Sequence, residues 1–246
     1  MLRQILKSAV DFTFPVHCPF CLTSPQLSVA SDAAVCDDCR QKIAPTLEHQ
    51  CQRCGAETGP FAQTTTGCTH CRGKPIRFQS VTCLGMYNDH MRRAILSGKW
   101  SWSTAVIEHL AELLLTERLD ELISAEPDLI IPIPQGWTSR LFRPFNPAGI
   151  IAAVLSRGLR IPCDEHILRR RGQPRPQKRV SVQRRYENQK DSFRLRDSHV
   201  IQSKRILLVD DVLTTGATCS EATRLLQMHG AGHCGVAVLA RVLDGR

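Results

Sequence analysis

The chain has 246 residues, of which 42% are hydrophobic and 22% charged, as in ordinary globular proteins. This composition excludes disordered and fibrous classes, and the length allows one well-packed domain plus a small module. The formal net charge of +9 is moderate, and most of the positive excess lies after residue 76, where any contact with a polyanion is expected.

The N-terminal residues carry Arg3 and Lys7 but no sustained apolar run before Asp11, so no secretion signal is predicted. A membrane-spanning helix needs roughly 18 or more consecutive apolar residues, and charged residues interrupt every hydrophobic segment of this chain. We therefore expect a cytoplasmic protein without membrane insertion.

Eight of the twelve cysteines form four C-x-x-C pairs before residue 72: Cys18/Cys21, Cys36/Cys39, Cys51/Cys54 and Cys68/Cys71. Two thiols at this spacing can bind one tetrahedral ion, and a second pair completes its shell. The pattern predicts two structural Zn²⁺ ions, because four thiolates leave no coordination position open. The spacing allows sequential pairing of the C-x-x-C units, and it also allows a cross-braced one in which Cys18/Cys21 and Cys51/Cys54 share an ion.

A disulfide framework or a redox-active C-x-x-C is less favoured, because no secretion signal is found and four copies are present. His70 could replace one thiol, but the set of cysteines is already complete. The four remaining cysteines stand singly in apolar or helical surroundings and are expected to be buried: Cys83, Cys163, Cys219 and Cys234.

From residue 77 short apolar runs alternate with helical patterns. Strands are predicted at residues 80–87, 129–133, 205–209 and 235–240, and helices at 103–124, 148–159 and 219–228. This alternation indicates an α/β fold with a parallel sheet and flanking helices. We divide the chain into a zinc-binding head, residues 1–76, and an α/β domain, residues 77–246. Ligands of such sheets bind outside the carboxyl ends of the strands.

Two basic segments lie beside this predicted sheet. The loop after Ile131-Pro132-Ile133-Pro134 carries Arg140 and Arg143, which could hold pyrophosphate. Residues 168–196 are the most basic part of the chain, and they predict a mobile loop followed by a short helix. This segment could be a lid over a phosphorylated ligand, a nucleic-acid groove or a solvated excursion.

Acidic and hydroxyl side chains follow the apolar run Ile206-Leu207-Leu208-Val209. Asp210 and Asp211 are expected to surface where the strand ends, where they can accept hydrogen bonds from vicinal hydroxyls. Thr214-Thr215-Gly216-Ala217-Thr218 then leads into a helix, whose free N–H groups favour a monophosphate. Each feature alone could be an ordinary loop with a helix cap, but their contiguity predicts a site for a ribose 5-phosphate.

Two other phosphate motifs are excluded. The chain has no G-x-x-x-x-G-K-[ST] sequence. The match to G-x-G-x-x-G at residues 230–235 follows a helix and precedes a strand, which reverses the context of dinucleotide binding.

The segment from Val209 to Thr218 resembles the signature of type I phosphoribosyltransferases. Together with the cysteine pairs, it makes the whole chain similar to the ComF family of competence and DNA-utilisation proteins. The resemblance also rests on further residues: Lys99, Arg140, Arg143, Phe145, Asn146, Gln177, Arg185, Asn188 and Phe193. The chain departs from that family at Pro144 and Pro147, which stiffen the pyrophosphate loop.

The resemblance implies a double zinc ribbon followed by a type I phosphoribosyltransferase-like domain. It implies phosphoribosyl diphosphate with Mg²⁺ as ligand, Asp210 and Asp211 at the ribose diol, and Lys99 with the loop arginines in the catalytic site. Residues expected at the 5-phosphate are Thr214, Thr215, Gly216, Ala217 and Thr218. Residues expected in a lid or nucleic-acid contact are Gln177, Arg184, Arg185 and Asn188.

Two functions of different classes follow from this reading. One is Mg²⁺-dependent phosphoribosyl transfer to an acceptor that the sequence does not identify. The other is a non-catalytic, single-stranded DNA-binding component of DNA uptake or processing. The family resemblance alone implies competence or DNA-processing proteins as partners.

Overall fold

The computed structural model describes residues 18–21, 35–62, 67–100, 104–136, 145–171 and 182–243. Its centre is a four-stranded parallel sheet in the order β1-β6-β5-β2. The strands are β1 (Ser80–Met86), β2 (Leu129–Pro132), β5 (Arg205–Leu213) and β6 (His233–Arg241). Their residues are buried in long runs, as expected of strands covered on both faces. The predicted α/β class is confirmed.

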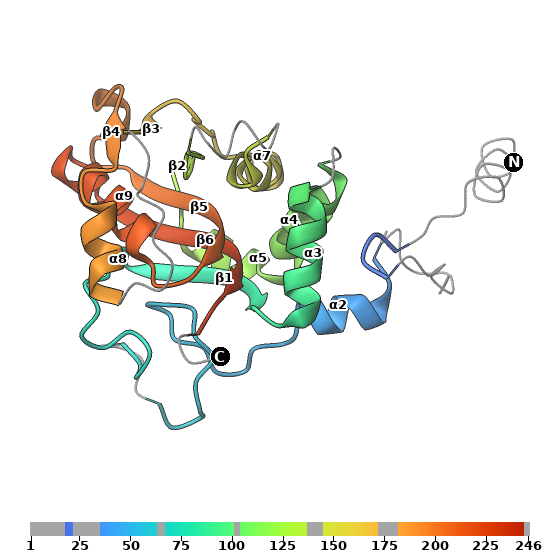
Figure 1. Cartoon of the computed structure of the whole chain (residues 1–246). Coiled ribbons are helices and arrows are strands. Elements are labelled where there is room, and N and C mark those ends of the chain that lie inside the picture. The colour runs from blue at the N-terminus through green and yellow to red at the C-terminus, as the bar shows by residue number, and fades with distance from the viewer. Residues whose placement is uncertain are drawn as a thin grey trace, which may run out of the picture.

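Helices cover both faces of the sheet (Figure 1). They are α2 (Asp37–Ile43), α3 (Asp89–Trp100), α4 (Ala105–Glu117), α5 (Leu119–Ser124), α7 (Pro147–Leu159), α8 (Val182–Gln189) and α9 (Ala217–Met228). Along β5, Leu207 and Val209 pack in the cluster formed with α4 and α7, whereas Ile206 and Leu208 pack in the cluster formed with α9. This alternation follows from the two-residue period of a strand. Among the described residues, no helix is both long and apolar enough to span a bilayer.

The helix predicted over residues 103–124 is interrupted at Arg118. The Arg118 side chain is buried, and its guanidinium donates hydrogen bonds to the carbonyl oxygens of Pro45, Cys83 and Leu84. Unpaired carbonyls and an unpaired buried cation would both be costly. At the break between α4 and α5, Arg118 therefore links these two helices to β1 and to the head.

Strand β5 is longer than predicted, and this corrects the expected position of the acidic pair. The strand runs to Leu213 instead of ending at Val209, because its ladder with β6 continues as far as Leu213 opposite Arg241. The ladder with β2 stops at Pro132 opposite Val209. Asp210 and Asp211 thus lie within the strand, and they are half-buried at the point where one of its edges opens.

The basic segment 168–196 also differs from the prediction at its two ends. A mobile loop and a short helix were expected; the helix is present as α8, and residues 172–181 lie outside the described residues. The ends are strands β3 (Leu168–Arg170) and β4 (Phe193–Leu195), which form an antiparallel pair. Leu168 and Phe193 are buried against the α9 face of the sheet and hold the pair there.

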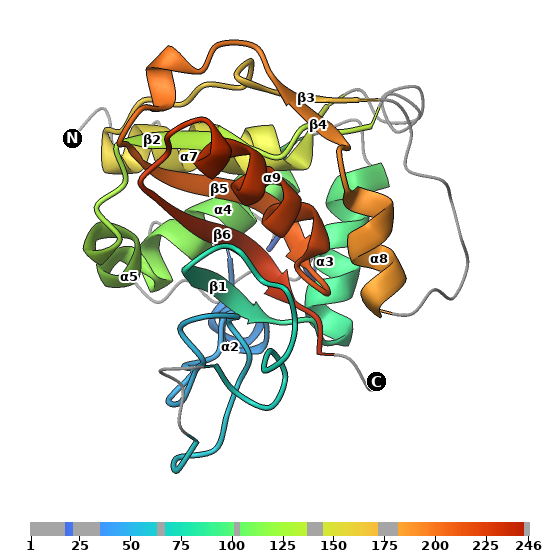
Figure 2. The ribbon, with the colours of Figure 1, turned by 90° about the vertical axis from the view of Figure 1, so that its left-hand side faces the viewer.

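The head contacts the sheet beside β1 (Figure 2). Cys51, Cys54, Cys68 and Cys71 belong to the apolar cluster on the α9 face, and the Val81 N–H donates to the Gln52 carbonyl at 2.8 Å. Cys18 and Cys39 belong to the cluster on the α4 and α7 face. The two C-x-x-C quartets are therefore packed against opposite faces of one sheet.

Candidate functional site

A pocket of about 210 Å³ opens at the carboxyl edge of the sheet, where the rule for parallel sheets places ligands. Six elements or their ends contribute to it: the segment after β2, the end of α3, the start of α7, strand β3, strand β5 and the start of α9. The lining residues are Lys99, Ile133, Pro134, Gln135, Gly136, Asn146, Pro147, Ala148, Arg170, Asp210, Asp211 and Thr218.

The two carboxylates of the pocket differ in environment. Asp211 forms an ion pair with the Lys99 ammonium. Burial and the neighbouring Asp211 charge raise the pKa of Asp210 to about 7, although Lys99 and Arg170 act in the opposite direction. The Cys219 thiol lies 4.0 Å from an Asp210 carboxylate oxygen, and burial raises the pKa of that thiol well above its usual value. The ionised form of the buried Asp210 carboxyl is thus disfavoured, and a hydroxyl donor or a cation beside it would stabilise that form.

Arg170 faces this acidic side from β3. Its guanidinium lies 5.3 Å from the centre of the Phe193 ring and donates to Gln189 at 3.0 Å. Its Nε and the Gln135 Nε2 are buried donors without an acceptor in the described protein. Such groups are rarely left unpaired, so both are available to donate to an acceptor in the pocket that they line.

From the sequence, Arg170 is part of the basic segment 168–196 and is not predicted to belong to the site. The strand β3 that positions it is three residues long, too short for a periodic signal. The apolar pair Ile167-Leu168 at the start of this segment is a local indication of burial, and both residues are buried.

The loop at residues 214–218 turns sharply into α9. Gly216 has φ of 82°, and a Cβ on it would come within 3.1 Å of the Phe78 ring, so that glycine is required there on both counts. The Tyr186 hydroxyl donates to the Thr215 carbonyl at 2.8 Å, and the Ala217 N–H lies 3.4 Å from the Thr215 hydroxyl. The N-cap residue Gly216 has no side chain that could cap α9, and the first N–H groups of a helix have no intrahelical acceptor. The loop can therefore receive an anion.

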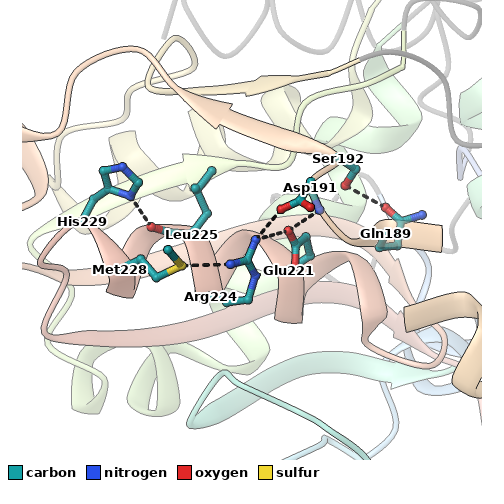
Figure 3. Close-up of polar contacts among 8 residues, drawn as sticks. All are labelled: Gln189, Asp191, Ser192, Glu221, Arg224, Leu225, Met228 and His229. Atoms are coloured by element: carbon teal, nitrogen blue, oxygen red, sulfur yellow. Dashed lines mark hydrogen bonds and ion pairs between the residues drawn. The ribbon is translucent and has the colours of Figure 1, made fainter. Parts of the chain in front are cut away.

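Helix α8 and the turn after it are attached to α9, the helix that begins at the loop (Figure 3). The carboxylate of Glu221 accepts a hydrogen bond from the Asp191 N–H at 2.7 Å. Arg224 pairs with Glu221 at 2.8 Å and with Asp191 at 3.0 Å. Because Glu221 is buried, this link is better shielded from solvent than a surface ion pair. The basic segment is thus joined by specific contacts to the helix that begins at residues 214–218.

The structure brings together some of the predicted site residues and leaves others apart. Lys99, Asp210, Asp211 and Thr218 share the pocket. Arg184, Arg185 and Asn188 are exposed on α8. Arg140, Arg143, Pro144 and Gln177 lie outside the described residues.

The second unusual proline of the predicted pyrophosphate loop has a local explanation. Pro147 is the first residue of α7, where the missing N–H has no cost and the fixed φ favours the helix. The Asn146 side chain before it donates to the Ile133 carbonyl at 3.1 Å, so the start of α7 is tied to the end of β2.

The eight head cysteines form two clusters, Cys18/Cys21/Cys36/Cys39 and Cys51/Cys54/Cys68/Cys71, each with its sulfur atoms within 4.8 Å of one another. Sequential pairing is therefore the one adopted, and the cross-braced alternative is wrong because the two quartets lie on opposite faces of the sheet. Individual Sγ distances of 3.6 to 4.0 Å fit the edge of a tetrahedron around Zn²⁺ with bonds of about 2.3 Å. None of the twelve cysteines forms a disulfide. Both clusters fit structural zinc.

Comparison with known proteins agrees with this architecture. Residues 103–246 match the phosphoribosyl transferase domain family, and residues 9–72 match the double zinc ribbon domain family. The chain is 29% identical to Competence protein F of Haemophilus influenzae over 211 residues, 84% of this chain and 90% of that protein. The chain belongs to the ComF family. The resemblance inferred from the sequence is confirmed.

Another ComF relative is DNA utilization protein YhgH of Escherichia coli O157:H7, which is 30% identical over 212 residues, 85% of this chain and 91% of that protein. Among solved structures, the purine phosphoribosyltransferase of Pyrococcus horikoshii aligns with 54% of this chain and 73% of its own. That alignment has a TM-score of 0.35 and 21% identity.

Proposed function

We propose that this ComF-family protein binds phosphoribosyl diphosphate, or a closely related phosphorylated ribose, at the carboxyl edge of its sheet. The observation that carries the proposal is one continuous surface. Asp210 and Asp211 line a pocket whose wall continues into Thr218 in the first turn of α9. A ribose 5-phosphate needs both parts, because its vicinal hydroxyls donate to carboxylates and its phosphate accepts from N–H groups.

The proposed roles follow the position of each side chain. The loop Thr214, Thr215, Gly216, Ala217 and Thr218 would hold the 5-phosphate, and Asp210 with Asp211 would hold the ribose diol. Lys99 and Arg170 are the described cations that line the pocket, and they would hold the diphosphate together with Arg140 and Arg143. The buried Nε of Arg170 and Nε2 of Gln135 would find their acceptors in its oxygen atoms.

Mg²⁺ fits the same pocket. Carboxylate oxygens are ligands that Mg²⁺ prefers. Burial, and after it the Asp211 charge, raises the pKa of Asp210 to about 7, so a cation beside this carboxyl would favour its ionised form. Bound with the diphosphate, the ion would neutralise the charge of the leaving group. Asp210 and Asp211 are the residues that would hold it.

The reaction class proposed for this site is phosphoribosyl transfer. The bond between ribose C1 and the pyrophosphate oxygen would break, and a nucleophilic acceptor would form a bond to C1 and release its proton. The contribution of this chain would be binding, orientation and electrostatic stabilisation of the departing pyrophosphate. Lys99 and Arg170 are placed for the last of these tasks.

The test measures phosphoribosyl diphosphate binding by titration calorimetry, with and without Mg²⁺, and pyrophosphate release with nucleobase or single-stranded acceptors. The double variant Asp210→Asn/Asp211→Asn should weaken binding by about a hundredfold, since two hydrogen bonds to charged groups are lost. Asp128→Asn is the matched control, because Asp128 accepts from the Arg205 N–H at the opposite edge of the sheet. Wild-type protein that binds no phosphoribosyl diphosphate would refute the proposal.

The cellular context is proposed from the relatives. Those relatives are described as DNA utilization and competence proteins, so we propose a role in DNA uptake or utilisation, with competence or DNA-processing proteins as partners. A reducing compartment such as the cytoplasm suits eight thiolate ligands.

A second candidate function, binding of single-stranded DNA, is favoured by one observation. Arg184 and Arg185 are exposed on α8, and Arg194 is exposed on β4 close by in the same basic segment. Phosphate contacts from such side chains make affinity fall steeply with salt. Binding should weaken with salt and weaken further in Arg184→Glu/Arg185→Glu. The control Arg157→Glu/Arg160→Glu makes the same charge change at the far end of α7 and should have little effect on DNA binding. Absent or salt-insensitive binding of single-stranded DNA would exclude this function.

A further inference from the structure

Arg241 is a buried cation between the second cysteine cluster and the phosphate loop. It is the last residue of β6 and is 2% exposed. Its Nε donates to the Cys54 carbonyl at 2.7 Å, and its Nη1 donates to the Leu213 carbonyl at 3.1 Å and to the Thr214 carbonyl. One guanidinium thus connects a proposed zinc ligand with the first residue of the loop.

The charge of Arg241 has no carboxylate partner among the described residues. A buried cation is costly unless it is paired, and carbonyl dipoles offset only part of this cost. Two anionic groups adjoin its hydrogen-bond partners in the loaded protein. They are the four-thiolate zinc centre that includes Cys54, which carries net negative charge, and the phosphate proposed for the loop beginning at Thr214. Occupancy of either site would therefore change the electrostatic environment of the Arg241 guanidinium.

The contact with Thr214 also determines how the loop presents its donors. A trans peptide group points its C=O and N–H in opposite directions. Arg241 holds the Thr214 carbonyl, and the Tyr186 hydroxyl holds the Thr215 carbonyl. The N–H groups of Thr215 and Gly216, which belong to the same two peptide groups, must then point away from Arg241 and Tyr186. Two side chains thus fix the orientation of two loop N–H groups.

We propose that Arg241 is a positioning residue that couples the second zinc centre to the phosphate loop. The zinc centre holds the Cys54 carbonyl, that carbonyl holds the guanidinium, and the guanidinium holds the Thr214 carbonyl so that the loop N–H groups stay aligned. Loss of zinc at this centre loosens the loop, and an anion bound in the loop slows the loss of zinc, because such coupling is reciprocal. The identity of the anion rests on the proposed function, whereas the coupling of cluster and loop does not.

A matched control exists in the same molecule. Arg118 is also a buried arginine, and it likewise donates to carbonyls of the head and the sheet, those of Pro45, Cys83 and Leu84. It has no contact with the loop or with the second cluster in the described structure. Arg118→Gln therefore reproduces the general cost of removing a buried guanidinium. Arg241→Lys keeps the positive charge but removes the planar guanidinium that donates to several carbonyls at once.

The first measurement is hydrogen exchange of the loop amides at residues 214–218, with no ligand present. Arg241→Gln and zinc-depleted wild type should both exchange these amides about tenfold faster than zinc-loaded wild type, the effect of losing one hydrogen bond to a charged group. Arg241→Lys should fall between them, and Arg118→Gln should leave the loop amides unchanged. Equal loop exchange in Arg241→Gln and Arg118→Gln would overturn the coupling.

The second measurement follows zinc release to a chelator with and without phosphoribosyl diphosphate. In Arg241→Gln one of the two zinc equivalents should leave about tenfold faster, and in wild type the ligand should slow that same equivalent. If wild type binds no phosphoribosyl diphosphate, the proposed function fails, but exchange and zinc release without ligand still decide the coupling. Release unaltered by Arg241→Gln would overturn it.

Discussion

At the scale of single residues, the site depends on a small number of charges near one strand edge. Asp210 and Asp211 are adjacent in the chain, yet Asp211 is paired with Lys99 while Asp210 has a pKa raised to about 7 by burial and by Asp211. Arg170 approaches the same carboxylate from a strand of a different sheet. This arrangement stores unfavourable electrostatic energy that a ligand or a cation can relieve.

The raised pKa of Asp210 predicts how stability depends on pH. Between the unfolded value near 4 and the folded value of about 7, the folded state binds more protons than the unfolded state, so the contribution of Asp210 to stability falls as pH rises through this window. Asp210→Asn removes the cost of ionising this buried carboxyl. The variant should therefore raise the free energy of unfolding at pH 8 by about 2 kcal/mol, with little effect at pH 4.

Urea unfolding of both proteins at pH 4 and pH 8 checks this expectation. Asp120→Asn, at an exposed position of α5, is the control and should show the same change at both pH values. A variant at residue 210 that is less stable than wild type at pH 8 would contradict the electrostatic account.

At the scale of elements, the loop at residues 214–218, which we propose binds the phosphate, is held by contacts from outside its own strand and helix. Phe78 packs under Gly216, and Tyr186 on α8 binds the Thr215 carbonyl. The end of α8 is tied to α9 through Glu221 and Arg224 (Figure 3). Helix α8 is therefore fixed beside the loop. A segment that only extended into solvent would not make these contacts.

Removal of the Tyr186 hydroxyl tests this element-level contact. Tyr186→Phe keeps the aromatic ring but releases the Thr215 carbonyl, so phosphoribosyl diphosphate should bind about fivefold more weakly, with about 1 kcal/mol lost in stability. The other tyrosine of the chain provides the control: Tyr87→Phe, just after β1, should leave the affinity unchanged. Titration calorimetry measures both, and equal affinity of Tyr186→Phe and wild type would show that the hydroxyl does not position the loop.

At the scale of the whole molecule, the predicted boundary between residues 76 and 77 is crossed by many contacts. The second cysteine cluster is part of the apolar cluster that contains Val81 and Leu208, and the first shares its cluster with Leu84 and Val209. The division into two domains stays a prediction, but the two parts share buried surface on both faces of the sheet. Metal binding in such a protein contributes directly to the stability of the fold.

Because the two parts share buried surface, we expect that removing one cysteine ligand of the zinc destabilises the entire chain. Cys54→Ser should cost about 3 kcal/mol or more and should lower the temperature of a single calorimetric transition. Cys163→Ser, at a half-buried cysteine outside both clusters, should leave the transition nearly unchanged. A separate, unshifted transition for residues 77–246 would show instead that the head unfolds alone.

The sequence by itself determined the features that depend on local spacing. Four C-x-x-C pairs identified the eight metal ligands, apolar runs located the four sheet strands, and the contiguity of Asp210, Asp211 and Thr214 to Thr218 predicted the site, because neighbours in the chain remain neighbours in space. Only the tertiary structure decided the pairing of the cysteine quartets, the extension of β5 beyond Val209, and the places of Arg170 and Arg241. Those features depend on contacts between segments distant in the chain, such as Cys54 with Arg241, and no local pattern encodes which distant carbonyl or carboxylate a buried arginine meets.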